Sequence, residues 1–144
     1  TAIDEEKIVR VILILLSNSI KFSKEKGDIC VEMRREDEEV VIKVTDNGIG
    51  INEDMKEKIF DKFKRVQSVS NLNVDHEGSG LGLYIAKGFI ELHNGSISVV
   101  SEVEKGSTFI ITIPIVIIKN DLHNIKHMDE DELNRIIKIE LSDL

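Results

Sequence analysis

The chain has 144 residues, of which 41% are hydrophobic and 32% are charged. This length and mixture suit one compact domain with a core of its own and leave no room for a second large domain. With 27 acidic against 19 basic residues the formal net charge is -8, which disfavours broad binding to nucleic acid or to an anionic membrane.

The cysteine content and the length of the apolar runs argue against a disulfide-bonded protein and against a membrane-spanning one. Cys30 is the only cysteine, so no internal disulfide can form, and its place in an alternating apolar run favours a small core residue. The longest aliphatic runs, VILILL and IPIVII, are much shorter than the roughly 20 residues that cross a bilayer. We therefore expect a soluble, intracellular chain. It starts almost directly inside a helix and without an initiating Met, so we also expect a piece of something longer.

The first predicted elements are a helix and a hairpin. From Asp4 to Phe22 apolar residues cover nearly every side of a helix that Asp4 can cap, which predicts that this helix is buried. The segments DICVEMR (28–34) and EVVIKVT (39–45) then alternate apolar with polar residues across an acidic turn. That alternation is typical of an antiparallel hairpin.

Glycines interrupt the middle of the chain twice. DNGIGI (46–51) breaks the strand pattern, and NEDMKEKIFDKF (52–63) restarts a helical spacing behind Asn52. Residues 64–79 are polar, have no clear period and are longer than an ordinary connection, so they are either a functional lid or disordered. GLGLYIAKGFIELHNG (80–95) predicts a glycine-rich turn that leads into a helix.

A second hairpin completes the predicted fold. Residues 96–118 alternate like two strands that turn near EKG, with Pro114 close to their end. After Lys119 the composition becomes polar, and residues 129–144 fit either an amphipathic helix or a short strand. The order predicts an α+β fold: a two-layer α/β sandwich whose mixed, mostly antiparallel sheet is covered on one face by helices.

Two polar residues stand out on the first helix. Asn18 and Lys21 are three residues apart and share a face with Ile14. A buried polar group without a partner costs about 1 to 3 kcal/mol, so a partner or a ligand is required. A solvated helix end would explain Lys21, because lysine side chains easily reach solvent. It explains Asn18 less well, since Asn18 follows six apolar residues and one serine.

The glycine clusters could bring backbone amides close to a ligand. Asp46 follows a strand, and Gly48 and Gly50 give the adjacent backbone unusual freedom, although a plain Asp-Gly turn is a common alternative. Gly80 and its neighbouring glycines precede a helix whose free amides attract phosphate. Neither the Walker lysine motif nor the dinucleotide G-x-G-x-x-G spacing is present, so neither common phosphate loop applies.

Five segments in order resemble the ATP-binding catalytic domain of sensor histidine kinases, in the GHKL superfamily of ATPases and kinases. LLSNSIKFS resembles the N box, DNGIGI the first glycine box, IFDKFKRV the F box, GSGLGLYIAKGFIELHNG the second glycine box and GSTFIITIP the closing strand motif. The resemblance implies ATP and Mg²⁺ as ligands, residues 64–79 as an ATP lid and protein histidine kinase activity. It divides the chain into a catalytic domain (1–119) and a C-terminal linker and tail (120–144).

The same resemblance implies roles for individual residues. Asn18 would give its amide oxygen to Mg²⁺, Lys21 would meet the charge of the phosphates, and Arg65 would stabilise the transferring phosphoryl group. Asp46 would accept the adenine amino hydrogens with help from Thr108. The rest of the implied nucleotide site is Phe22, Ile51 and Phe63 beside the base, Gly50 where the base approaches the backbone, Gly80, Leu81 and Gly82 at the phosphates, and Gly48, Gly78 and Leu83. For Phe60 we expect ordinary core.

Ile14 departs from the family pattern. Histidine kinases usually carry a second asparagine at this position, four residues before the metal-binding one, so metal coordination could be weaker here. In GHKL hydrolases an acidic residue at this position acts as the base for water. Isoleucine cannot do so, which disfavours an ATP-hydrolysing clamp, whereas a neutral imidazole acceptor needs no such base.

The phosphate acceptor is expected to be outside this chain. None of the four histidines, His76, His93, His123 and His127, is in the H-E-x-x-x-P setting of the family, and His93 is expected to be structural. The implied partners are a histidine-containing dimerisation domain and a response regulator receiver domain, with no nucleic acid. Such a domain is cytoplasmic, although full-length members are often membrane-anchored. Two alternatives stay open: a degenerate nucleotide-binding or interaction module, and a serine kinase of the anti-sigma type, which the F box disfavours.

Overall fold

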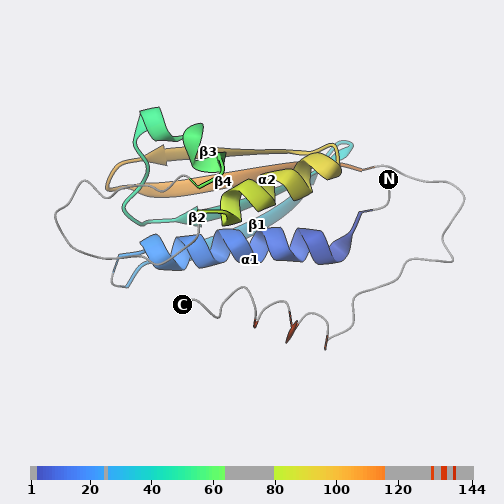
Figure 1. Ribbon diagram of the computed structural model, residues 1–144, viewed down its shortest axis with the longest axis horizontal. Helices are drawn as coiled ribbons and strands as arrows, with labels where there is room; N and C mark the ends of the chain where they lie inside the picture. The colour runs from blue at the N-terminus through green and yellow to red at the C-terminus, as the bar shows by residue number, and fades with distance from the viewer. Residues whose placement is uncertain are drawn as a thin grey trace, which may run out of the picture.

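The computed structural model describes residues 3–24, 26–63 and 80–115, together with residues 131, 134, 135 and 138. The first helix, the first hairpin, the last helix and the second hairpin follow one another in the predicted order (Figure 1), whereas the helix expected at 52–63 is not formed and the lid expected at 64–79 lies outside the described residues. The helices and strands are α1 (Glu5–Phe22), β1 (Ile29–Glu36), β2 (Glu39–Asp46), α2 (Gly82–Leu92), β3 (Ser96–Glu102) and β4 (Gly106–Pro114). Within these residues no helix has the length and apolar character needed to cross a bilayer.

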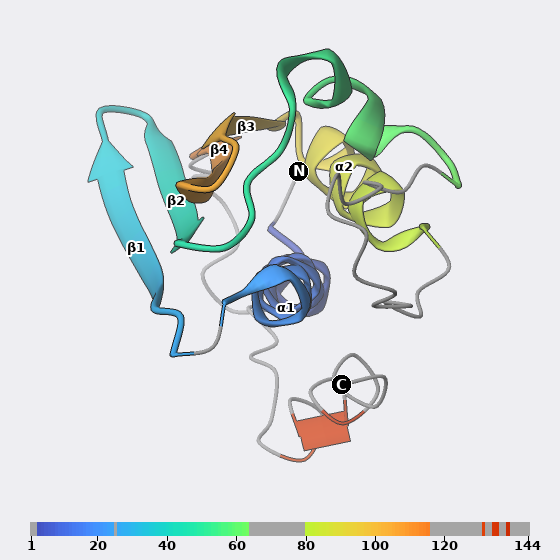
Figure 2. The ribbon, with the colours of Figure 1, turned by 90° about the vertical axis from the view of Figure 1, so that its left-hand side faces the viewer.

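The four strands form one sheet in the order β1-β2-β4-β3. Each pairing between them is antiparallel, so the sheet is not mixed as we expected but antiparallel throughout its described part. Figure 2 shows α1 and α2 on the same side of this sheet. The predicted two-layer α+β architecture is therefore confirmed.

Helix α1 packs against the sheet on one side and against the neighbouring helix α2 on another (Figure 2). Asp4 caps it by accepting a hydrogen bond from the backbone N–H of Lys7 at 3.2 Å, and Glu5 and Glu6 occupy its positively polarised first turn. Apolar side chains of both helices and of the inner sheet face form one core. Its fully buried members include Val11, Leu15, Ile42, Val44, Ile90 and Ile111.

The strand register decides which side chains face the helices. Asp46 on β2 lies opposite Ser107 on β4, and both are buried on the inner face with Val44 and Phe109. Successive strand residues point to opposite faces, so their neighbours point outward. Cys30 is on that outer face of the edge strand β1 and is exposed, so the expectation of a core cysteine was wrong.

The segment between β2 and α2 differs from the expected helix. It forms two 3-10 turns, Glu53–Met55 and Lys58–Phe60, and Asn52 makes no side-chain capping bond. The second turn buries Ile59 and Phe60 in the core. After the end of α2, Asn94 adopts a left-handed conformation with φ 56°, and the N–H of Gly95 bonds the carbonyl of Ile90 at 3.0 Å.

Candidate functional site

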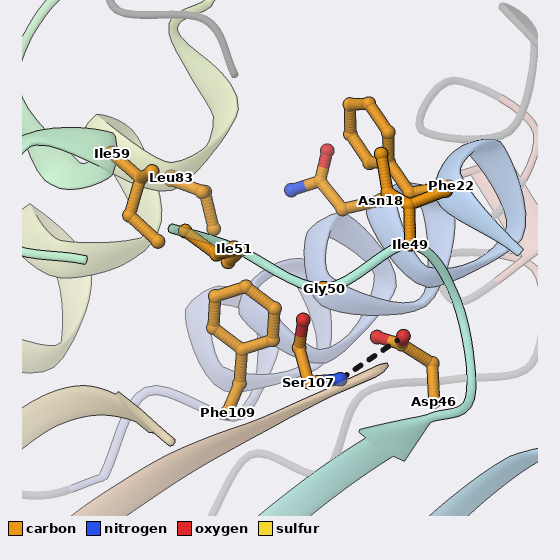
Figure 3. Close-up of a pocket in the computed structure, with 10 residues that line it drawn as sticks. All are labelled: Asn18, Phe22, Asp46, Ile49, Gly50, Ile51, Ile59, Leu83, Ser107 and Phe109. Atoms are coloured by element: carbon orange, nitrogen blue, oxygen red, sulfur yellow. Dashed lines mark hydrogen bonds between the residues drawn. The ribbon is translucent and has the colours of Figure 1, made fainter. Parts of the chain in front are cut away.

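A pocket opens where the C-terminal half of α1 meets the ends of β2 and β4 (Figure 3). The empty space in and directly in front of the pocket is about 410 Å³, including open solvent, and most of the lining is apolar. Its walls come from α1, from the loop after β2, from the second 3-10 turn, from α2 and from β4. The lining residues are Asn18, Phe22, Asp46, Ile49, Gly50, Ile51, Ile59, Leu83, Ser107 and Phe109.

Asp46 supplies the carboxylate of this pocket and is only 6% exposed. Its Oδ1 accepts the backbone N–H of Gly48 at 2.9 Å and that of Ser107 at 3.3 Å, while its Oδ2 accepts the hydroxyl of Ser19 at 3.3 Å. A buried carboxylate needs such donors, because an unpaired one is strongly disfavoured. The loop, the neighbouring strand and α1 therefore all orient this one side chain.

Two serines extend the hydrogen bonding behind the carboxylate. Ser101 Oγ donates to the carbonyl of Gly106 at 2.8 Å and accepts the backbone N–H of Ile51 at 2.8 Å. Ser107 Oγ is 2.9 Å from Ser101 Oγ, and because the one proton of Ser101 is already used, Ser107 is the donor of that bond. The lone pairs of Ser107 are left as further acceptors at the pocket wall.

The loop at residues 46–51 is held between α1 and the β3–β4 turn. The N–H of Ile49 bonds the carbonyl of Phe22 at 3.2 Å, and the carbonyl of Ile49 accepts the N–H of Glu104 at 2.8 Å. Gly50 has φ +71°, and a Cβ there would collide with the carbonyl of Glu102. Glycine is therefore required here by the backbone of β3, and Gly50 also lines the pocket.

Asn18 and Phe22 project from the last turns of α1 into the pocket, as expected. In Figure 3 the Asn18 amide lies on one side of the strip formed by Ile49, Gly50 and Ile51, and the Asp46 carboxylate lies on the other. Lys21 is half-buried and does not line the pocket.

Ile14 lies one turn before Asn18 and is only 6% exposed. Its Cγ2 is 3.2 Å from where a Cβ of Gly82 would be, at the first residue of α2. This position is thus apolar core between α1 and α2.

The structure separates other expected site residues from the pocket. Phe63 is 64% exposed, with the ammonium of Lys62 5.1 Å from its ring centroid, and it is not a lining residue. Thr108 points to the outer sheet face, where its hydroxyl is 3.1 Å from that of Thr45, so Ser107 occupies the place that we expected Thr108 to fill. Phe60 is core, as expected, and its ring packs edge-on against Phe109 at 6.4 Å.

The glycine-rich turn before α2 lies beside the pocket wall. Gly80 has φ +68° and accepts the N–H of Phe63 at 3.2 Å, Leu81 is the N-cap residue, and Gly82 begins the helix. Of the described residues 80–83, only Leu83, in the first turn of α2, lines the pocket. Arg65, Gly78, His76 and the proposed lid at 64–79 lie outside the described residues.

Four lining residues were missed by sequence reasoning: Ile49, Ile59, Ser107 and Phe109. The alternation of β4 contained the signal for two of them, since Ser107 and Phe109 are two apart and share a face. Ile49 belongs to the same loop as Gly48 and Gly50. Only Ile59 needed the tertiary structure, because it approaches from a 3-10 turn.

The chemistry of this pocket favours a flat, apolar ligand that carries an N–H donor. Aliphatic and aromatic side chains form its walls, and one carboxylate with a remaining acceptor position is at its end. No cluster of three or more His, Cys, Asp or Glu side chains that could hold a metal ion by itself occurs among the described residues.

Comparisons with known proteins agree with this geometry. The family model of histidine kinase-, DNA gyrase B- and HSP90-like ATPases matches residues 3–117. The sensor protein RprX of Bacteroides fragilis is 41% identical over 120 residues, which are 82% of this chain and 22% of RprX. The structure of the mycobacterial sensor histidine kinase MprB has a TM-score of 0.68 at 28% identity, over 77% of this chain and 74% of that one.

A second solved structure, full-length ShkA in complex with AMPPNP, has a TM-score of 0.65 at 28% identity and covers 77% of this chain and 22% of ShkA. The chain spans less than a quarter of the length of RprX and of full-length ShkA. The match to the family model covers most of the chain and includes every element of the pocket. The chain therefore belongs to the histidine kinase-, DNA gyrase B- and HSP90-like ATPases, as an ATP-binding catalytic domain of the sensor histidine kinase type.

Proposed function

We propose that this chain binds Mg-ATP in the pocket and transfers the γ-phosphoryl group to a histidine on a separate dimerisation domain. From there the phosphoryl group would pass to the receiver domain of a response regulator. The observation that carries the proposal is the buried Asp46 carboxylate at the end of an apolar pocket. An adenine ring has flat apolar faces and an exocyclic amino group, and it fits both features.

Each part of the nucleotide has a proposed neighbour. The base would lie between Phe22, Ile51 and Leu83, with its amino group toward Asp46. Its triphosphate would extend past Asn18 toward the start of α2, where the free N–H groups of a helix N-terminus favour negative charge. Lys21 and Arg65 are proposed to meet the phosphates.

The residues present fit a magnesium ion that is held mainly by phosphate and water. Mg²⁺ usually takes only one or two protein ligands in nucleotide sites, and the amide oxygen of Asn18 can be one of them. When bound, the ion would supply positive charge that offsets the charge of the phosphates. Ile14 adds no ligand, because its side chain is buried hydrocarbon.

The hydrogen bonds of His93 support a phosphoryl acceptor outside this chain. Its Nε2 accepts the backbone N–H of Asp4 at 3.0 Å, and its Nδ1 donates to the carbonyl of Phe89 at 2.7 Å. Both ring nitrogens are thus occupied, and the side chain is only 7% exposed. His76, His123 and His127 lie outside the described residues.

One observation favours a second candidate function, a degenerate module that binds nucleotide weakly or not at all and acts through contacts with other proteins. Ile14 stands where the resemblance expects a second asparagine, and the structure uses it for packing against α2. In that case the pocket would persist while magnesium contributed nothing to binding.

Calorimetric titration of the 144-residue chain with a non-hydrolysable ATP analogue, with and without Mg²⁺, separates the two functions. If the analogue binds and magnesium strengthens its binding, the kinase function is supported. If the analogue does not bind, both the proposed ATP site and the proposed phosphoryl transfer are refuted. Ile14→Asn is the informative variant, with Ile14→Val as its control. Because Ile14 is core, Ile14→Asn is expected to lose about 2 kcal/mol or more of stability, so its folding is checked first. Magnesium-dependent binding only in Ile14→Asn would favour the degenerate module.

A further inference from the structure

The acceptor capacity of Asp46 is nearly used up by the protein itself. An ionised carboxylate offers about four acceptor positions, two on each oxygen. Oδ1 takes the N–H groups of Gly48 and Ser107, and Oδ2 takes the hydroxyl of Ser19. One position on Oδ2 is left, and Asp46 lines the pocket, so this position can take one donor from a ligand.

Ser19 is a buried hydroxyl with a specific direction. It is 1% exposed, follows Asn18 on α1, and bonds a carboxylate 27 residues later in the chain. Alanine would be a better helix former at this position by a few tenths of a kcal/mol, roughly, and would bury no polar group. The bond of 3.3 Å is longer than the usual O–H···O distance of about 2.7 to 2.8 Å, which favours an orienting role over a large contribution to stability.

We propose that Ser19 is a positioning residue that makes the pocket specific for a 6-aminopurine. This inference rests on the proposed function and goes beyond it, because it assigns the selection between purines to a residue of α1. With Oδ1 held by two backbone N–H groups, the bond from Ser19 to Oδ2 fixes the plane of the carboxylate. The one remaining acceptor then faces the ligand in a fixed direction.

The purine at this site is selected by the group on its sixth carbon. Adenine presents an N–H donor there, whereas hypoxanthine and guanine present a carbonyl oxygen. A fixed carboxylate accepts the donor and repels the oxygen, and a site built around such a hydrogen bond discriminates strongly. Without Ser19 the carboxylate plane can rotate, so the adenine bond weakens and the carbonyl is repelled less.

The test compares ADP with IDP, whose bases differ at the sixth carbon and, as a consequence, at N1, which carries a hydrogen only in hypoxanthine. Both are titrated calorimetrically into the 144-residue wild type, Ser19→Ala, Ser17→Ala and Asp46→Ala. Ser17 is the matched control, because it is also a buried serine of α1 but projects from the opposite side of the helix. Thermal unfolding verifies that each variant is folded.

We expect Ser19→Ala to reduce the ratio of ADP to IDP affinity about 3- to 10-fold, the range of one ordinary hydrogen bond, and Ser17→Ala to leave it unchanged. A general destabilisation of α1 would lower the affinities for ADP and for IDP by the same factor, so their ratio would stay as in wild type. An unchanged ratio in Ser19→Ala, or an equal fall in Ser17→Ala, overturns the role of Ser19. If Asp46→Ala still abolishes ADP binding in that case, the proposed function stands. If wild type fails to bind ADP, or binds it no better than Asp46→Ala does, both proposals fail.

Discussion

At the N-terminal end of α1 the polar groups bond to one another and to α2, whereas at the C-terminal end they turn toward the pocket. Asp4 caps the helix and pairs with Lys7, and its backbone N–H bonds the ring of His93. Fourteen residues later, about 21 Å along the axis, Asn18 lines the pocket and Ser19 reaches Asp46.

The difference shows how a buried helix separates stability from function. Polar groups at the first end are satisfied within the chain, so their loss should lower the free energy of unfolding and leave binding intact. At the other end Asn18 and Asp46 keep hydrogen-bonding capacity for a ligand, so their loss should act mainly on binding. The predictions below test this division.

Asp46→Ala should have the largest effect. We expect the affinity for a non-hydrolysable ATP analogue to fall about 100-fold or more, because the variant removes the charged group that we propose as the acceptor of the adenine amino group. Calorimetric titration measures the loss. Since the N–H groups of Gly48 and Ser107 also lose their acceptor, Asp46→Asn, which keeps one oxygen, controls for folding. Undiminished affinity in a folded Asp46→Ala would remove Asp46 from base recognition.

His93→Ala should show the opposite result. The variant leaves the N–H of Asp4 and the carbonyl of Phe89 without partners and opens a cavity, which should lower the free energy of unfolding by about 2 kcal/mol. Urea denaturation measures this change. Below the unfolding transition the nucleotide affinity should equal that of wild type. A parallel loss of affinity would show that the two ends of α1 are coupled.

Asn18→Ala should change only the part of the nucleotide affinity that depends on Mg²⁺. The affinity without Mg²⁺ should change little, and most of the strengthening by Mg²⁺ should disappear, because the variant removes the one amide oxygen that we propose as a metal ligand. Titrations with and without Mg²⁺ measure both quantities. Asn52→Ala is the matched control, because Asn52 is also a half-buried asparagine but is outside the pocket. If Mg²⁺ strengthens binding equally in wild type and Asn18→Ala, the metal is held elsewhere.

The fold could be predicted where the pattern of a single element was sufficient. The apolar faces of α1 and the alternation of the two hairpins specified these elements and the α+β class. The helical spacing of residues 52–63 did not form a continuous helix but two separate 3-10 turns, of which only the second contains buried residues. The prediction that Cys30 lies in the core was wrong because alternation distinguishes the two faces of a strand but does not show which face the helices cover.

The site could be predicted only as far as its motifs extend along the chain. Asn18, Phe22, Asp46 and Leu83 belong to recognisable segments, and all four line the pocket. Choosing between Ser107 and Thr108 required the register of β2 against β4, which pairs Asp46 with Ser107. Ser19 was overlooked because its partner is 27 residues away and a serine in a helix has no distinctive pattern.

The smallest effect is expected from the charge of Asp4. The hydrogen bond from the Lys7 ammonium holds the pKa of the Asp4 carboxyl below its ordinary value of 3.8. The pair therefore stabilises the fold above the unfolded pKa, and this contribution disappears as the pH falls through the lower folded value. Because the carboxyl side chain is 39% exposed, solvent screens the pair and its contribution should be less than about 0.5 kcal/mol.

Asp4→Asn isolates this charge, because asparagine caps a helix as well as aspartate does. The variant should be slightly less stable than wild type in urea at neutral pH, and the two should converge at a pH well below 3.8. Their nucleotide affinities should agree at neutral pH, since Asp4 is at the N-terminal end of α1, far from the pocket. A stability difference that grows on acidification would mean that the folded pKa is raised instead, and an altered affinity would mean that this end of the helix also contributes to binding.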